Sequence, residues 1–286
     1  MKYITKILFP TDFSDPAKEA FQYTLALARR FNASIKVIHV VQPEYESSDI
    51  PAMAGQMVSQ KVEAAKEVLK AFIKSGVQKV DPEIIKVIEI TSEVEVGLPS
   101  GAIASASRRD EIDLTVIGTK GVHNVWEKFF GSTTSNVIQK ASGNILVVPI
   151  GTAFRDFKKI VYATDLSETD AYQILKVAQI MNLFEPSVDC IHVARRFNAK
   201  VKDTRMNELA EFFKEIDPGL RITFNEINNQ SVSDGLVDFV EKHNADLLCM
   251  FAPNRTFFDR IFHNSLTQRM PYLTKIPMLI LKNKKR

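Results

Sequence analysis

An internal repeat constrains the fold of this 286-residue chain more than any other feature of its sequence. Four apolar segments recur in the same order, the first two at an offset of 153 residues and the last two at an offset of 133. The pairs are ILFPTDFS (7–14) with IVYATDLS (160–167), VIHVV (37–41) with CIHVA (190–194), IDLTVI (112–117) with ADLLCM (245–250), and NILVVP (144–149) with PMLILK (277–282). The repeat predicts two copies of one domain, residues 1–151 and 152–286.

The change of offset predicts an insertion in the first copy. The two offsets differ by 20 residues (153 − 133), so the extra residues lie between the second and third apolar segments. The Pro/Glu/Ser-rich stretch PEYESSDIPAMAGQ at 43–56 has the composition of a loop, and we expect the insertion there.

Helical and strand patterns alternate along each copy. In the first copy, apolar residues recur at helical spacing in 15–31, and further helices are expected at 59–76 and 100–110. The apolar segments of the repeat, together with EIIKVIEI at 83–90, have the nearly continuous apolar character of parallel strands covered on both faces. The pattern predicts an α/β fold with one open, doubly wound parallel sheet per copy, and ligands in such sheets bind at the carboxyl ends of the strands.

Composition narrows the classes of function. The chain is 45% hydrophobic and 25% charged with a net charge of +3, and it contains no apolar run of 18 residues and no signal-peptide pattern. Cys190 and Cys249 lie in apolar strand-like runs, as reduced, buried thiols do. We therefore expect a cytoplasmic protein with no membrane association. No basic stripe with interleaved aromatic residues occurs, so we expect no nucleic-acid partner.

Residues 116–136, VIGTKGVHNVWEKFFGSTTSN, have the features of a phosphate-binding loop. The apolar segment before it ends at Gly118, Gly121 follows, and Gly131–Ser132 begins a predicted helix. Glycine lets a phosphate approach the backbone, and a helix N-terminus offers free N–H groups. The stretch is neither a Walker P-loop nor a dinucleotide-binding fingerprint. From the spacing alone, glycines that only make turns and a Ser132 that only caps the helix remain an alternative.

The chain resembles the ATP-binding universal stress proteins in three segments: the glycine pattern, ILFPTDFS and VIHVV. Gly118, Gly121, Gly131 and Ser132 match that family's G-2x-G-9x-G-[ST] pattern, and ILFPTDFS resembles its first strand and the acidic turn that follows. The resemblance covers the first copy throughout and the second more loosely, so the chain resembles a tandem universal stress protein. It implies a Rossmann-like fold of the adenine nucleotide alpha hydrolase-like group in both copies.

The resemblance also implies roles for individual residues. It implies that Pro10, Thr11 and Asp12 line an adenine nucleotide site beside Val40, and that Asp12 lies near the ribose or a bound Mg²⁺, which favours carboxylate and phosphate oxygens. On the sequence alone, Asp12 could instead cap the following helix, and the two roles are compatible. The implied phosphate ligands for ATP or ADP are Gly118, Gly121, Gly131, Ser132 and Thr133.

The second copy lacks the glycines of this pattern. Asp165 is present in YATDLS, but residues 251–270 contain no glycine, and Phe251 stands opposite Gly118 at the offset of 133. Side chains at the glycine positions would fill the space that a phosphate needs. We expect a second universal stress protein domain with a degenerate motif, and one nucleotide per chain.

The function expected from these features is that of a nucleotide-binding module in a stress or regulatory response, with slow ATP hydrolysis at most, because the motif offers no evident general base. An adenylating ligase-like enzyme of the same α/β group and a nucleotide-independent protein-interaction module are the alternatives. The resemblance implies that the last strands of the two copies meet, so that the domains pack as an intrachain pseudo-dimer. A homo-oligomer through the paired domains and an unidentified protein partner are further expectations.

Overall fold

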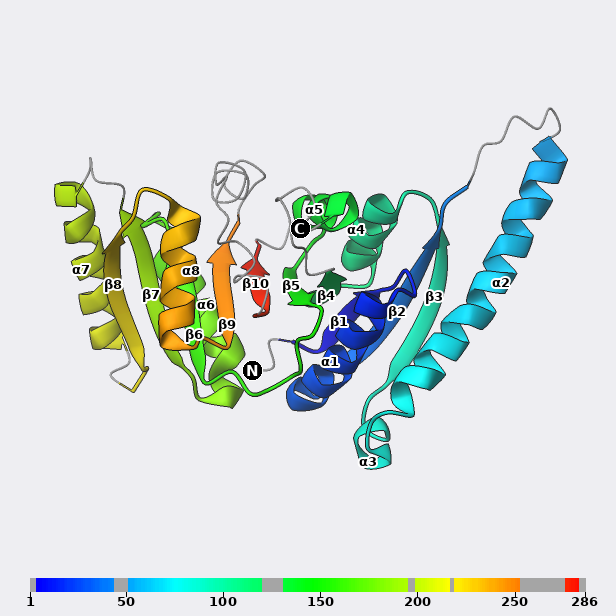
Figure 1. Cartoon of the computed structure of the whole chain (residues 1–286), viewed down its shortest axis with the longest axis horizontal. Coiled ribbons are helices and arrows are strands. Elements are labelled where there is room, and N and C mark those ends of the chain that lie inside the picture. The colour runs from blue at the N-terminus through cyan, green and yellow to red at the C-terminus, as the bar shows by residue number, and fades with distance from the viewer. Residues whose placement is uncertain are drawn as a thin grey trace. The chain divides into compact units, whose positions relative to one another are not determined.

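A computed structural model describes residues 4–43, 51–119, 131–194, 199–216, 219–252 and 276–282, with the backbone alone of residues 51–54, 84, 131–132 and 199–203. These residues form two compact domains, residues 4–153 and residues 154–282 (Figure 1). Each domain is described by itself below.

The first domain contains a five-stranded parallel sheet in the order β3-β2-β1-β4-β5. Its elements in chain order are β1 (Lys6–Pro10), α1 (Asp15–Phe31), β2 (Ser34–Val41), α2 (Pro51–Val77), α3 (Pro82–Ile85), β3 (Ile90–Val96), α4 (Pro99–Arg109), β4 (Leu114–Thr119), α5 (Gly131–Lys140) and β5 (Asn144–Pro149). The strand order reverses between β1 and β4, and ligand sites of doubly wound sheets lie at such reversals.

Helices cover both faces of this sheet. Right-handed crossovers place α1 and α2, which contact each other, on one face, and α4 and α5, also in mutual contact, on the other (Figure 1). Three aromatic rings join α1, α2 and β1, since Phe21 lies 5.2 Å from Phe9 and 5.3 Å from Phe72 between ring centroids. Helix α1 carries Pro16 in its first turn and ends at Asn32, whose left-handed backbone (φ 53°) lets its N–H reach the last carbonyls.

The strand predicted at 83–90 is wrong. Asp81 and Pro82 start a short helix instead, because the Asp81 carboxylate accepts a hydrogen bond from the Glu83 N–H at 2.9 Å and proline suits the first helical position. The strand is β3, at Ile90–Val96. It is the last strand of the first domain's sheet on the β2 side, so it contains exposed and half-exposed polar residues, and the continuous apolar pattern is missing.

Part of the predicted insertion is helical. Helix α2 begins at Pro51, inside the stretch 43–56 predicted as a loop, and residues 44–50 lie outside the described part. With 27 residues, α2 is nine residues longer than the 18-residue α7 at the equivalent place in the second domain (27 − 18). Residues 55–64 of α2 are exposed or half-exposed, so this part of the helix covers little of the core.

The second domain repeats the same topology, with a parallel sheet in the order β8-β7-β6-β9-β10. Its elements are β6 (Lys159–Thr164), α6 (Asp170–Met181), the 3₁₀ helix η2 (Asn182–Phe184), β7 (Ser187–Ala194), α7 (Ala199–Ile216), β8 (Ile222–Asn228), α8 (Val232–His243), β9 (Leu247–Phe251) and β10 (Met278–Leu281). Both cysteines are free and buried, as predicted. The predicted tandem α/β fold is confirmed. None of the helices in the described ranges has both the length and the apolar character needed to span a membrane.

Candidate functional site

Three neighbouring strands of the first domain bring most of the predicted site together at their carboxyl ends. Strand β1 pairs with β2 on one side and with β4 on the other. Continuing these two registers past the paired residues puts Asp12 level with Val40 and Thr11 level with Gly118. Pro10, the last residue of β1, leads directly into this row. The strand-order reversal therefore lies where the sequence predicted a ligand.

The turn that follows β1 is held by two side chains. The Thr11 hydroxyl accepts a hydrogen bond from the Phe13 N–H at 3.0 Å, and Asp12 Oδ1 accepts one from the Ser14 N–H at 3.0 Å. Phe13 takes a left-handed conformation (φ 65°), and Ser14, not Asp12, is the N-cap residue of α1. Asp12 is exposed, and its Oδ2 has no hydrogen bond among the described residues, so one carboxylate oxygen remains available.

The second domain contains the same turn. Thr164 Oγ1 accepts from the Leu166 N–H at 2.9 Å, Asp165 Oδ1 accepts from the Ser167 N–H at 3.2 Å, and Leu166 is left-handed (φ 60°). Asp165 therefore has a structural reason to be present without a nucleotide. In the first domain, the same backbone function uses one oxygen of Asp12 and leaves the other exposed.

Histidines support both turns from the next strand. His39 Nδ1 lies 2.8 Å from the Thr11 carbonyl oxygen, and His192 Nδ1 lies 3.1 Å from that of Thr164. The His39 ring also stacks on Phe13, with 4.2 Å between centroids. The sequence signal for these supports is the repeat itself, because histidine occurs at the same place in VIHVV and CIHVA.

Gly118 is required by the packing of the first domain. A β-carbon at this position would lie 2.7 Å from the Pro16 carbonyl oxygen and 2.8 Å from the Ala20 β-carbon, both on α1. The missing side chain therefore lets the first turn of α1 approach β4. In the second domain, Phe251 is the residue equivalent to Gly118. Helix α6 begins at Asp170, two residues after the position equivalent to Asp15, where α1 begins.

Thr119 is a residue that sequence reasoning missed. It ends β4, it is 4% exposed, and its hydroxyl has no hydrogen-bond partner in the described part of the chain. Because successive residues of a strand face opposite sides, Thr119 points away from α1, toward the face that carries α4 and α5. A buried hydroxyl without a partner is costly, so Thr119 suits a polar contact at this edge.

The other predicted phosphate ligands belong to α5 and to the loop before it. Helix α5 begins at Gly131, so the backbone N–H groups of its first turn, Gly131 to Thr133, include the free donors of a helix N-terminus. Thr133 is exposed, and only the backbone of Ser132 is described. Gly121 lies outside the described residues, with the rest of 120–130. The structure therefore describes where the loop leaves β4 and where it enters α5.

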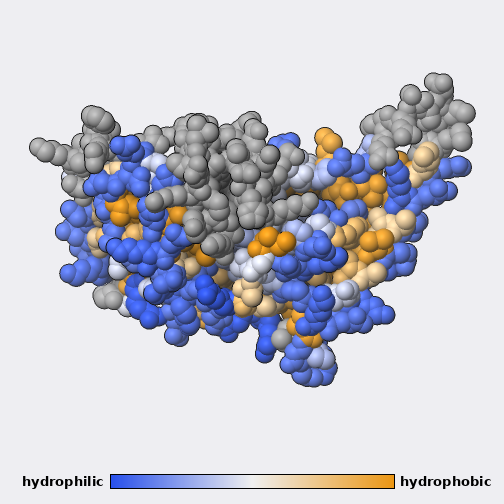
Figure 2. All heavy atoms as spheres, in the orientation of Figure 1, coloured by the Kyte–Doolittle hydropathy of each residue, from blue (hydrophilic) through white to orange (hydrophobic). Residues whose placement is uncertain are grey.

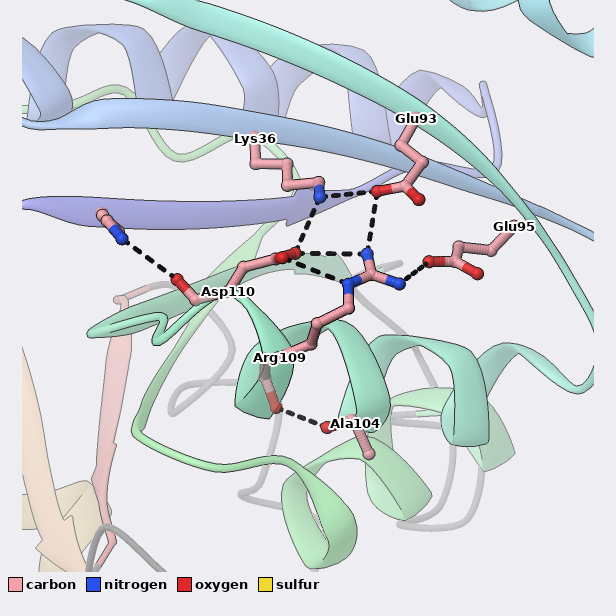
Figure 3. Close-up of polar contacts among 8 residues, drawn as sticks. Lys36, Glu93, Glu95, Ala104, Arg109 and Asp110 are labelled. Carbon is pink, nitrogen blue, oxygen red and sulfur yellow. Dashed lines mark hydrogen bonds and ion pairs between the residues drawn. The ribbon is translucent and has the colours of Figure 1, made fainter. Parts of the chain in front are cut away.

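Five charged side chains form a network between β2, β3 and the C-terminal end of α4 in the first domain (Figure 3). Lys36 on β2 lies 2.5 Å from Glu93 and 2.7 Å from Asp110, and Arg109 at the end of α4 lies 2.8 Å from both Glu93 and Glu95. Each charge thus has an opposite charge beside it. The network ties β2, β3 and α4 together.

One member of the network, Glu95, is level with a residue of the candidate site, and the others lie farther toward the amino ends of the strands. Hydrogen bonds to Asp110 and Glu95 raise the pKa of Arg109 above its usual range. Burial raises the pKa of Asp110, but hydrogen bonds from Arg109 and Lys36 outweigh it, so the net shift is downward. Glu95 lies level with Val40 in the β2–β3 register, and its pairing with Arg109 reduces its repulsion of any anion at that edge.

The second domain has a buried polar cluster that has no counterpart among the described residues of the first domain. Asp170, 2% exposed, accepts hydrogen bonds from the Tyr162 hydroxyl at 3.0 Å, from the Thr164 hydroxyl, and from the Ser167 N–H at 3.0 Å. Burial raises the pKa of Asp170, and hydrogen bonds offset only part of the shift. The equivalent residue of the first domain is Ala17. The two turns therefore have similar backbones over different interiors.

The described ranges contain no group of three or more His, Cys, Asp or Glu side chains arranged to hold a metal ion. Among the described residues of the candidate site, Asp12 offers an exposed carboxylate oxygen. A single carboxylate fits Mg²⁺, which commonly binds through one or two carboxylates together with phosphate oxygens and water.

The comparisons with known proteins agree with this architecture. The model of the universal stress protein family matches twice, at residues 4–149 and 156–282. A universal stress protein of Methanocaldococcus jannaschii is 28% identical over 151 residues, 50% of this chain and 93% of its own length. One from Thermus aquaticus is 29% identical over 143 residues, 50% of this chain and 96% of its own length.

A solved structure shows the same fold along the whole chain. The crystal structure of a universal stress protein from Archaeoglobus fulgidus has a TM-score of 0.68 at 16% identity, covering 99% of this chain and 98% of its own. The two matches to the family model together cover nearly all of the residues. The chain belongs to the universal stress protein family, with two family domains in tandem.

Proposed function

We propose that the first domain binds one molecule of ATP or ADP with Mg²⁺ and that this binding serves a regulatory role in a stress response. The observation that carries the proposal is the position of Val40, Asp12 and Gly118 at the carboxyl ends of three adjacent strands, β2, β1 and β4, where the strand order reverses. The glycine pattern of the family occurs in the first domain only.

Each part of the site has a chemical role in this proposal. The backbone at Val40 contacts the base, Pro10 and Thr11 line the wall of the site, and Asp12 Oδ2 binds Mg²⁺ or the ribose. The phosphates lie between β4 and the N-terminus of α5, where free N–H groups and the helix dipole favour an anion. Their ligands are Gly118, Gly121, Gly131, Ser132 and Thr133.

The second domain, in this proposal, binds no nucleotide. Asp165 is explained by its turn, where Oδ1 accepts the Ser167 N–H. Phe251, 6% exposed, stands where the first domain has Gly118. The remaining positions of the second copy's phosphate loop fall in residues 253–275, outside the described part. We therefore propose one nucleotide per chain.

Hydrolysis is slow or absent in this proposal. Asp12, the acidic residue of the site, already holds the turn through Oδ1, and its remaining oxygen is assigned to the cation. A carboxylate bound to a metal is a poor general base for water. Turnover well below the typical enzyme rate of about 10 per second is the expected result.

Calorimetric titration of the chain with ATP and Mg²⁺ tests the proposal. We expect one bound nucleotide per chain and loss of binding in Gly131→Val, because a branched side chain at the first residue of α5 crowds the phosphates. Gly101→Val is the matched control: Gly101 lies in the first turn of α4, and a β-carbon there meets no atom within 4 Å. A folded Gly131→Val protein with undiminished affinity would contradict the assignment, and a wild-type chain that binds no nucleotide would favour a protein-interaction module.

A further inference from the structure

Two apolar side chains are exposed at the carboxyl end of β3. Val96 is 48% exposed and ends the strand, and Leu98, two residues later, is 74% exposed. Figure 2 shows apolar surface gathered over the carboxyl ends of β2 and β3, between α4 and α2. Covering these side chains would be favourable, because each exposes apolar area to water.

Leu98 also occupies a position where leucine is a poor choice. It is the N-cap residue of α4, and it makes no side-chain hydrogen bond to the helix. Serine, threonine, aspartate and asparagine are strongly preferred there, and an apolar residue forgoes the helix stability that such a cap provides. Neither burial nor capping accounts for a leucine at this place.

The second domain, which lacks the glycine pattern, has polar residues at the positions equivalent to Val96 and Leu98. Gly97 N–H donates to the Val41 carbonyl, and Asn229 N–H donates to the Ala194 carbonyl, so residues 97 and 229 are equivalent. Val96 and Leu98 thus correspond to residues 228 and 230. Those residues are Asn228 and Gln230, both exposed. Helix α8 is capped by Ser231, whose hydroxyl accepts a hydrogen bond from the Asp234 N–H.

The apolar pair therefore occurs only in the domain that has the phosphate-binding pattern. It lies next to the proposed site, because Val96 is level with Val41, the neighbour of Val40, in the β2–β3 register. We propose that Val96 and Leu98 cover one face of the nucleotide's base and contribute to the selection of a nucleoside phosphate over inorganic polyphosphate. The inference rests on the proposed function of the first domain.

The charges around the pair fit a neutral aromatic ligand group. Glu95 precedes Val96 and is held by Arg109 at 2.8 Å, on the opposite face of the strand. On the other face, Val96 is level with Val41, and His39, two residues before Val41 on the same strand, stacks on Phe13. A purine, with two flat and weakly polar faces, suits such a surface better than a charged group does.

The test is a comparison of two ligands across three variants. In Leu98→Ser and Val96→Thr we expect the affinity for ATP with Mg²⁺ to fall, by about tenfold for Leu98→Ser, since covering a leucine side chain is worth about that factor. The affinity for tripolyphosphate with Mg²⁺ is expected to stay unchanged. Serine is a favoured N-cap, so Leu98→Ser is expected to fold at least as stably as the wild type.

Val87→Ser is the matched control, since Val87 is 63% exposed and precedes β3 at its other end. It is expected to leave both affinities unchanged. The inference is wrong if Leu98→Ser binds ATP as tightly as the wild type does, or if ATP and tripolyphosphate lose affinity equally. If the wild-type chain binds neither ligand, the proposed function itself fails together with this inference.

Discussion

Replacing Gly118 by alanine should destabilise the first domain, against the usual effect of this substitution. Alanine in place of glycine within a strand ordinarily stabilises by about 0.5–1 kcal/mol, because the unfolded chain loses freedom. Here the added β-carbon would lie 2.7 Å from the Pro16 carbonyl oxygen and 2.8 Å from the Ala20 β-carbon. The first atom is a backbone atom of α1 and the second is a β-carbon fixed by that backbone, so neither can move aside unless the helix itself shifts.

The magnitude follows from these contacts. Overpacking against a rigid neighbour costs about 1–3 kcal/mol. After subtraction of the glycine effect, the middle of each range leaves a net loss of about 1 kcal/mol in the free energy of unfolding. The first turn of α1, which contains Pro16, is the part that must move, so its amides should exchange faster.

Urea unfolding followed by circular dichroism measures the loss, and hydrogen exchange of residues 15–31 locates it. Gly101→Ala is the control, because a β-carbon at Gly101 meets nothing within 4 Å, and this helical position should gain about 0.5–1 kcal/mol. A Gly118→Ala protein as stable as the wild type, with unchanged exchange in α1, would refute the argument that Gly118 is needed for the approach of α1.

Further predictions concern the charged network and the buried carboxyl group. Arg109→Met should cost at most about 1 kcal/mol at low salt and less at high salt, because exposed ion pairs with Glu93 and Glu95 are screened; urea unfolding at two ionic strengths checks this. For Asp170, a raised folded-state pKa means that the stability contributed by the protonated form is present below the ordinary pKa near 4 and is lost as pH rises through the folded-state value. The stability of the wild type relative to Asp170→Asn should therefore fall as the pH rises above about 4; a rise in urea unfolding experiments would contradict the assigned shift. In Ser231→Ala, loss of the cap of α8 should cost about 1 kcal/mol by the same measurement, and an unchanged stability would show that the cap contributes nothing.

Most of the fold could be predicted because the repeat and the apolar runs carry independent information. Segments 7–14 and 160–167 predict equivalent strands and turns, and the structure forms both with the same hydrogen bonds. The strand at 83–90 could not be placed, because β3 has water on one side and its half-polar sequence resembles a loop. The first part of the apolar segment at 83–90 is helical instead, because the Asp81 carboxylate caps the short helix that begins at Pro82.

The candidate site could be predicted only in part. The resemblance to the family identified Asp12 and Gly118, and the spacing located the end of β4 and the start of α5. It did not show that Gly118 also makes room for α1, because that contact joins residues about a hundred positions apart. It also missed Thr119, whose buried hydroxyl is evident only in the structure.

Hydrogen exchange with and without ATP and Mg²⁺ tests most directly the claim that one domain of the tandem binds the nucleotide. The account predicts slower exchange in the turn at residues 11–14 and in the first turn of α5, with no change in the equivalent turn at residues 164–167. Both turns have the same backbone hydrogen bonds, so each serves as the reference for the other. Equal protection of the two turns, or protection of neither, would contradict the account.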